Sequence, residues 1–198
     1  MKKFELTTDS IKRNGVTLYR IKSLIDFEDV KAGDLGGYVE KEENLSQYGD
    51  AWAFDDAQVY GNACVYGNAC VSDNAQVRGN ARVSGNARVF DNACVRGDAQ
   101  VGGNSRLHGD ALVCDNARVV GNARVSGDAD YIHLKEFGSH NRNTTMFREE
   151  NGNIYVSCGY FSGTLQEFES KVKETHGNSE FAREYQELVE AAKIHFEV

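Results

Sequence analysis

Hydrophobic and polar positions alternate with a period of six residues through the middle of the chain. From about Gly49 to Ile132 an aliphatic residue returns at every sixth position, and a small residue, nearly always alanine, stands two places before it. The phrase V-x-[GD]-[ND]-A-x describes this run without a gap. An α-helix has about 3.6 residues per turn, so this period does not fit a helix. It predicts short strands separated by corners.

Each position of the phrase has a physical reason. Valine favours extended backbone and fills a narrow interior, and alanine leaves room for a bend. Glycine, aspartate and asparagine tolerate positive φ and local hydrogen bonds at the corner. Asp55, Asp73 and Asp91 replace the glycine at every third phrase, as expected if three phrases make one turn. The sequence therefore predicts a triangular parallel β-helix of about five coils, about 24 Å long at about 4.8 Å per coil.

The segment before the repeat predicts a cover for one open end. Residues 4–27 read as two strands joined at Asn14-Gly15, a strong hairpin signal. Val39 and Leu45 keep the phase of the small position, so we expect the coils to begin there with larger residues. Unpaired strand edges favour association with other chains, which is why a cap is needed.

The segment after Tyr131 predicts a cover for the other end. Residues 144–161 read as a hairpin, and two amphipathic helices follow, with Thr164 and Ser179 as their caps. The polar stretch 138–145 is expected to be a linker, with a binding loop as the alternative. The fold prediction is thus mainly β, in three segments: a β-hairpin cap (1–38), a hexapeptide-repeat β-helix (39–132) and an α+β domain of ββαα order (133–198).

The V-x-G-N-A-x phrase, preceded by DFEDVKAGDLGGYVEKEENLSQYGDAW (residues 26–52), resembles the hexapeptide-repeat, left-handed β-helix proteins. It is similar to poorly characterised bacterial and phage-encoded members. The resemblance implies a left-handed coil, a homotrimer and a phage or prophage source. Its best-known members are acyltransferases, whose commonest phrase puts glycine directly after the aliphatic residue. Here glycine comes one place later, so the acyltransferase branch is not favoured.

Composition and charge narrow the range of possible functions. The 198 residues carry a net charge of −8 and no apolar run long enough to cross a membrane, so we expect neither general nucleic-acid binding nor a membrane partner. The five cysteines form no CxxC pair, so we expect free thiols, no zinc or other metal site, and no cofactor. The start of the chain does not read as a signal peptide, and we expect a protein of the bacterial host cytoplasm.

Arginine recurs at free positions of the phrase. Between Val77 and Val125 there are seven arginines and no lysine, at positions Arg78, Arg82, Arg88, Arg96, Arg106, Arg118 and Arg124. Several of them recur three or six phrases apart, which predicts that they stack in rows along the coils. Like charges about 5 Å apart repel by about 0.8 kcal/mol even in water, so such rows need anions. Corner aspartates, carboxylates of a neighbouring subunit and an anionic ligand are the three alternatives, and guanidinium groups suit phosphate.

The favoured function is a non-enzymatic, oligomeric binding protein. Its arginine rows or subunit interfaces would hold a nucleotide-like anion, for example a signal of host defence, or a partner protein of the host. Tyr60 and Tyr66 are candidates to stack on a base or to line the trimer seam. One alternative is an acyltransferase with His108 as general base, and another is a structural spacer. A thiol–imidazole pair of Cys158 and His140 is a weaker candidate, since a strand cysteine is more often buried and inert.

Overall fold

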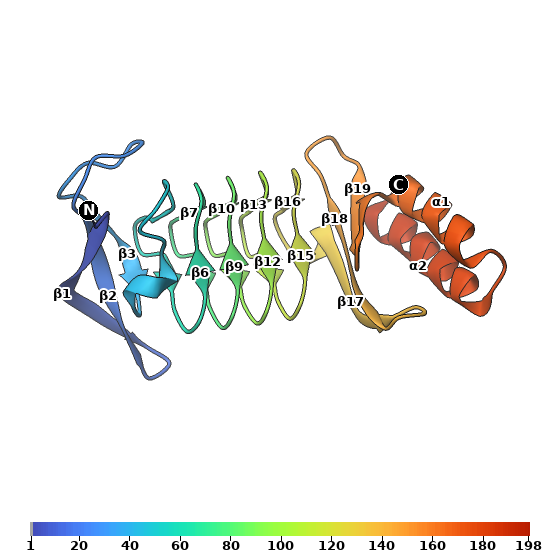
Figure 1. Cartoon of the computed structure of the whole chain (residues 1–198), viewed down its shortest axis with the longest axis horizontal. Helices are drawn as coiled ribbons and strands as arrows, with labels where there is room; N and C mark the ends of the chain where they lie inside the picture. Colours follow the sequence, from blue (N-terminus) through green and yellow to red (C-terminus); the bar gives the residue numbers. More distant parts are fainter. Residues whose placement is uncertain (1) are drawn as a thin grey trace.

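Stacked coils of three short strands form the middle of the chain in the computed structural model (Figure 1). The structure describes residues 2–198, without the side chain of residue 128, and Met1 of the predicted N-terminal cap lies outside the described residues. The strands stack in three walls. The first wall has β3 (Leu35–Val39), β5 (Gln58–Val59), β8 (Gln76–Val77), β11 (Cys94–Val95) and β14 (Leu112–Val113). The second has β6 (Cys64–Val65), β9 (Arg82–Val83), β12 (Gln100–Val101) and β15 (Arg118–Val119), and the third has β4 (Trp52–Ala53), β7 (Cys70–Val71), β10 (Arg88–Val89), β13 (Arg106–Leu107) and β16 (Arg124–Val125).

The register confirms the prediction of three phrases per coil. Val59 lies opposite Val77, and Val77 opposite Val95, in parallel strands three phrases apart. The five strands of the third wall give about five coils, as the sequence predicts. The aliphatic and small positions of the phrase point inward and are almost fully buried, so they form one continuous narrow core.

The spacing of the corner aspartates has a structural cause. Asp55, Asp73 and Asp91 all adopt positive φ, between 51° and 58°, at the corner where the chain passes from the third wall to the first. The carboxylate of Asp73 accepts a hydrogen bond from the backbone N–H of Asp91 at 3.2 Å. The carboxylate of Asp91 accepts one from the backbone N–H of Gly109 at 2.9 Å. These carboxylates therefore satisfy corner N–H groups that face the preceding coil.

The asparagine position builds a second ladder along each corner. The side-chain amide of Asn68 donates to Asn86 at 3.1 Å, Asn86 donates to Asn104 at 3.0 Å, and Asn104 donates to Asn122 at 3.1 Å. An amide both donates and accepts, so it can continue such a row, whereas a carboxylate can only end it. Asp98 accordingly accepts from Asn80.

The backbone hydrogen bonds between coils that lie outside the strand pairs point the same way. At these positions an N–H of one coil donates to a carbonyl of the coil that follows it in sequence, as Arg82 does to Ala99 at 2.9 Å, whereas the parallel strand pairs also hold bonds in the opposite direction. At the corners and strand ends the first coil therefore presents free carbonyls and the last coil presents free N–H groups. Buried groups of this kind must be paired, so the two ends need opposite chemistry.

Donors close the first end of the solenoid. The ammonium group of Lys3, only 2% exposed, donates to the carbonyls of Gly49 at 3.0 Å and Ala51 at 2.7 Å. Burial lowers the pKa of Lys3 to about 8, although the charge of Asp50 opposes this effect. The side-chain amide of Asn44 donates in the same way to the carbonyls of Gly61 and Ala63.

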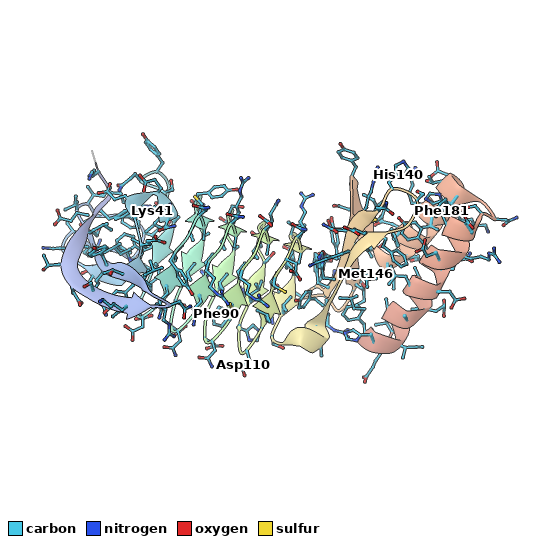
Figure 2. All side chains as sticks on the ribbon, turned by 90° about the horizontal axis from the view of Figure 1, so that it is seen from below. Lys41, Phe90, Asp110, His140, Met146 and Phe181 are labelled. Atoms are coloured by element: carbon cyan, nitrogen blue, oxygen red, sulfur yellow. The ribbon has the colours of Figure 1, made fainter. Side chains whose placement is uncertain are left out.

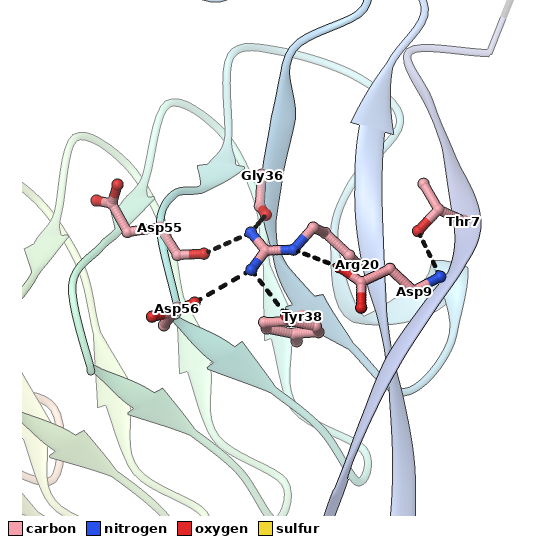
Figure 3. Close-up of polar contacts among 7 residues, drawn as sticks. All are labelled: Thr7, Asp9, Arg20, Gly36, Tyr38, Asp55 and Asp56. Atoms are coloured by element: carbon pink, nitrogen blue, oxygen red, sulfur yellow. Dashed lines mark hydrogen bonds and ion pairs between the residues drawn. The ribbon is translucent and has the colours of Figure 1, made fainter.

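Arg20 fastens the N-terminal strands to this end (Figure 3). The strands β1 (Phe4–Arg13) and β2 (Val16–Ser23) form the predicted hairpin, and β2 continues onto β3. The guanidinium group donates all five of its hydrogen bonds, and its partners are the carboxylates of Asp9 and Asp56, the hydroxyl of Tyr38 and the carbonyls of Gly36 and Asp55. It also lies 4.3 Å from the ring centroid of Tyr38.

The predicted phase of Val39 and Leu45 is wrong. Val39 pairs with Val59 and Leu45 with Val65, so both occupy the aliphatic position and not the small one. Leu45 lies six residues before Ala51, whereas Val59 lies four residues before its following alanine, Ala63. Two additional residues at the corner between Leu45 and Ala51 cause the difference.

Acceptors close the last end. The hydroxyl of Thr145 accepts a hydrogen bond from the backbone N–H of Arg118 at 3.1 Å. The carboxylate of Asp130 accepts one from the backbone N–H of Ser126 at 2.7 Å. Asp130 follows β16 within the 3-10 turn Asp128–Asp130, and Thr145 belongs to the sheet that follows. The last coil also receives donors, because the N–H of Glu150 donates to the carbonyl of Asn122 and the hydroxyl of Tyr131 to that of Leu112.

The C-terminal region contains more strands than the ββαα prediction. An antiparallel sheet has the order β17 (Tyr131–Phe137), β18 (Arg142–Arg148), β19 (Ile154–Cys158) and β20 (Phe161–Thr164), and α1 (Leu165–His176) and α2 (Glu180–Phe196) pack on it. Residues 138–145 are not a linker, because they form the turn after β17 and the start of β18. Thr164 and Ser179 cap the two helices as predicted. Within residues 2–198, neither helix is long and apolar enough to cross a membrane.

Replacement of a corner glycine tests how tightly the coils stack. Gly85 has φ +66°, and a Cβ there would lie 2.9 Å from the carbonyl oxygen of Gly103. Left-handed backbone costs a non-glycine residue about 1–2 kcal/mol, and the contact adds to this, so Gly85→Ala should lower the melting temperature by several degrees. Gly127→Ala is the control, because Gly127 has φ −165° and no described atom within 4 Å of the added carbon. Equal melting temperatures for both variants would contradict this account of the corner.

Candidate anion-binding face

The predicted arginine rows exist in the structure. In the third wall Arg88, Arg106 and Arg124 lie opposite one another on consecutive coils. In the second wall Arg82 and Arg118 lie on either side of Gln100. These side chains leave the strands on the outer surface, and side chains project in this way along the whole stack (Figure 2). Parallel stacking thus converts an interval of three phrases into a row of like charges.

A third set of arginines lies beside the first wall. Arg78 and Arg96 directly follow the paired strands β8 and β11, so they also occupy equivalent places on adjacent coils. Both side chains are half-buried, and the Nε atom of Arg78 is buried with no partner among the described residues. These two guanidinium groups are therefore less open to a ligand than those of the third wall.

Aromatic rings accompany the arginines of the third wall. Residues two apart in a strand point to the same side, so Phe90 lies beside Arg88 and His108 beside Arg106. The rings of Phe90 and His108 stack with centroids 5.2 Å apart and planes inclined by 15°. We define the arginine face as the outer surface formed by Arg88, Phe90, Arg106, His108 and Arg124.

Two projecting segments bound the arginine face at its ends. The loop around Phe27–Val30 and the turn between β18 and β19 both project on the side of β7, β10, β13 and β16 (Figure 1). A cavity of about 440 Å³ lies where the first loop meets Asn86 and Arg88. Another cavity, of about 260 Å³, lies between His108, Arg124 and the turn that carries Glu149 and Glu150. The middle of the face, between these ends, carries Arg106.

Most of the arginines lack a carboxylate partner. Among the described residues, Arg124 pairs with Glu150, and no acidic group lies within 4.0 Å of the other six arginines in the repeat. Corner aspartates were one expected partner, and this expectation is wrong for the described chain, because Asp73 and Asp91 face backbone N–H groups. Arg20, which is fully hydrogen-bonded, shows what a purely structural arginine looks like in this protein.

The two tyrosines predicted to contact a ligand differ. Tyr66 is 41% exposed, whereas Tyr60 is 7% exposed and packs with Leu18 and Tyr38 beneath the N-terminal hairpin. Asn14 donates a hydrogen bond to the hydroxyl of Tyr60 at 3.4 Å. Tyr60 therefore belongs to the cap, and the prediction that it stacks on a ligand is wrong.

Thiols near the arginines are not activated. Burial raises the pKa of Cys70, and the charge of Arg88 only partly opposes this effect. Burial likewise raises the pKa of Cys64 despite the charge of Arg82. A protonated thiol is a poor nucleophile, so these two thiols are not activated for attack.

Some contributors to the candidate sites were not identified from the sequence. Phe90 stands three phrases before His108, and this interval could have revealed the stacked pair. Nothing in the sequence could place Glu150 against Arg124, because they lie on different elements. His140 and Cys158 line one cavity of the C-terminal region, far along the chain from the arginine face.

Comparisons with known proteins agree with the architecture. A family model described as the YdcK beta solenoid repeat matches residues 57–73, 81–98 and 111–127. The chain is a repeat β-solenoid protein. A curated protein of Escherichia coli K12, named "Uncharacterized acetyltransferase YdcK", is 40% identical over 52 residues, which is 26% of this chain. The match spans 16% of that relative, so the likeness concerns the repeat and its name does not decide the activity of this chain.

Unpaired arginines should cost the solenoid stability. Arg106→Gln removes repulsion with Arg88 and Arg124 and should raise the melting temperature by about 2–4 °C at low ionic strength. The gain should shrink in 0.5 M salt at a Debye length of about 4 Å. Gln100→Arg completes the row of the second wall and should have the opposite effect.

Arg20→Gln serves as the structural comparison for the same charge change. It removes five hydrogen bonds from the N-terminal cap and should lower the melting temperature at every salt concentration. If Arg106→Gln also destabilised the protein at low salt, Arg106 would have a structural partner and the arginine face would not be a site of unneutralised charge.

Proposed function

We propose that the protein is a non-enzymatic binding scaffold whose arginine face holds an anionic, phosphate-bearing small molecule. The observation that carries this proposal is the pair Arg88 and Arg106, which are adjacent, exposed and without a carboxylate partner in the described chain. Guanidinium groups bind phosphate oxygens in pairs, and rows about 4.8 Å apart suit a ligand with several such oxygens.

The ligand class follows from the neighbours of these arginines. The stacked rings of Phe90 and His108 offer a π-surface beside the charged row. A nucleotide combines phosphates with a planar base, and aromatic side chains commonly stack on bases. The acidic residues at both ends, such as Glu28 and Glu150, disfavour a long polyanion that runs past them. A compact nucleotide is therefore favoured over a nucleic acid.

Assembly is the second element of the proposal. Arg82 and Arg118 of the second wall also lack carboxylate partners among residues 2–198, and a neighbouring subunit of a homotrimer would provide carboxylates for them. A phage source and the sequestration of a host-defence signal remain predictions from the sequence. Native mass spectrometry measures both the subunit number and any small molecule that copurifies.

The proposed anion binding by the arginine face is tested with ADP and pyrophosphate. Adenosine is the uncharged comparison. Calorimetric titration should show binding of both anions that weakens with salt. Arg106→Gln should weaken it about tenfold or more, because a hydrogen bond to a charged group contributes about 1.5–3 kcal/mol. Arg183→Gln makes the same charge change on exposed α2 outside the face and should leave the affinity unchanged. Arg82→Gln reports whether the second wall takes part.

Three outcomes would overturn the proposal. If neither anion binds and no nucleotide is released from heated protein, the favoured function becomes binding of an acidic partner protein or a structural spacer. If Arg106→Gln and Arg183→Gln bind equally, the site lies elsewhere. The name of the YdcK relative supports the alternative of an acetyltransferase, with His108 as general base beside Ser126 and Glu149. Binding of acetyl-coenzyme A that is lost in His108→Ala would favour that alternative.

A further inference from the structure

A second cavity lies in the C-terminal region, away from the arginine face. It has a volume of about 400 Å³ and lies between the sheet β17–β20 and the helices α1 and α2. Its apolar wall belongs to the C-terminal core and includes Cys158, Phe161, Phe168, Val172 and Tyr185. A volume of this size is typical of small-molecule sites.

Basic side chains line this cavity. Its described lining contains Arg142, Lys171, His140 and His176, and no aspartate or glutamate. Lys171 pairs with Glu174 at 2.8 Å, whereas Arg142 has no ion pair among the described residues. Arg142 is thus the group most open to an anion.

The cavity wall is held in a fixed shape. The ring of Tyr185 stacks on His176 at 5.6 Å and meets Phe168 edge-on at 5.5 Å. Its hydroxyl lies 4.0 Å from the sulfur of Cys158. A Cβ at Gly138 would lie 2.0 Å from that hydroxyl, so the turn after β17 approaches as closely as only glycine permits. The aromatic wall is therefore preorganised.

Arg142 is positioned at the mouth of the cavity. Its guanidinium lies 5.4 Å from the ring centroid of Tyr160, which is 98% exposed. A Cβ at Gly159 would lie 2.4 Å from the Cδ of Arg142, so this glycine makes room for the stem of the side chain. His140, labelled in Figure 2 near the C-terminal helices, belongs to the same rim.

We propose that this cavity binds a small aromatic anion, with its ring against Phe168 and Tyr185 and its carboxylate or phosphate on Arg142. The apolar wall accounts for the ring, and the unpaired guanidinium accounts for the charge. The site is independent of the arginine face, because it lies in a different region of the chain and shares no residue with it.

We test the site by titrating the isotope-labelled full chain with phenyl phosphate and with benzoate and recording NMR spectra during each titration. Benzyl alcohol and benzylamine are the neutral and cationic comparisons. Both anions should shift the amide signals of Cys158 and His176, and the neutral and cationic analogues should bind at least about tenfold more weakly, as expected for loss of a charge-assisted hydrogen bond.

Four variants test whether the anion binds in this cavity. Arg142→Gln should weaken phenyl phosphate binding about tenfold, whereas Arg183→Gln, an equal charge change outside the cavity, should not. Thr175→Trp places a large ring on an exposed lining position and should block entry without disturbing the core. Arg106→Gln should leave this binding intact, which distinguishes it from binding at the arginine face.

The proposal fails if the signals of the lining residues do not move with either anion. It also fails if benzylamine binds as tightly as benzoate, or if Arg142→Gln and Arg183→Gln have equal effects. Should Arg142→Gln fail to fold, as judged by its melting temperature, Thr175→Trp decides alone: retained binding with unchanged stability would overturn the proposal.

Discussion

The ladder of backbone hydrogen bonds between coils is the constraint on which this protein depends. Outside the parallel strand pairs, each coil donates its N–H groups toward the C-terminal end and presents its carbonyls toward the N-terminal end. A stack of this kind cannot finish by itself, because each end leaves unpaired backbone groups, mostly carbonyls at the first end and N–H groups at the last. The two caps provide partners for these backbone groups. Lys3, Asn44 and Arg20 bring donors to the first end, and Thr145 and Asp130 bring acceptors to the last.

The same stacking decides what the outer surface can do. Inward positions must be aliphatic or small, and corner positions must tolerate positive φ, so the outward positions are the most free to vary. Any residue repeated there at an interval of one coil becomes a row. A row of arginines repels itself, and the corner carboxylates, which accept backbone N–H groups, do not relieve it. The charge of Arg88 and Arg106 is thus unexplained by folding and consistent with a ligand.

The C-terminal region serves the fold and also adds a separate site. Its strand β18 supplies the acceptor for the last coil through Thr145, and its outer surface carries the helices. The cavity between sheet and helices has aromatic walls and a cationic rim. Proteins often place binding sites where a rigid scaffold meets an added element. The solenoid and its cap therefore carry the two proposed anion sites, which differ in shape, one open and one recessed.

The sequence by itself determined the coils, their register, the corner aspartates, the N-terminal hairpin and the two helices, because each follows from a local pattern. The phase of Val39 and Leu45 could not be read, since two extra residues at one corner shift it. The burial of Tyr60 could not be predicted either, because the hairpin that covers it lies far away in sequence. Which arginines find carboxylates, and that His140 and Cys158 line one cavity, are matters of long-range packing. Periodicity fixes neighbours one coil apart, and only the tertiary structure fixes the rest.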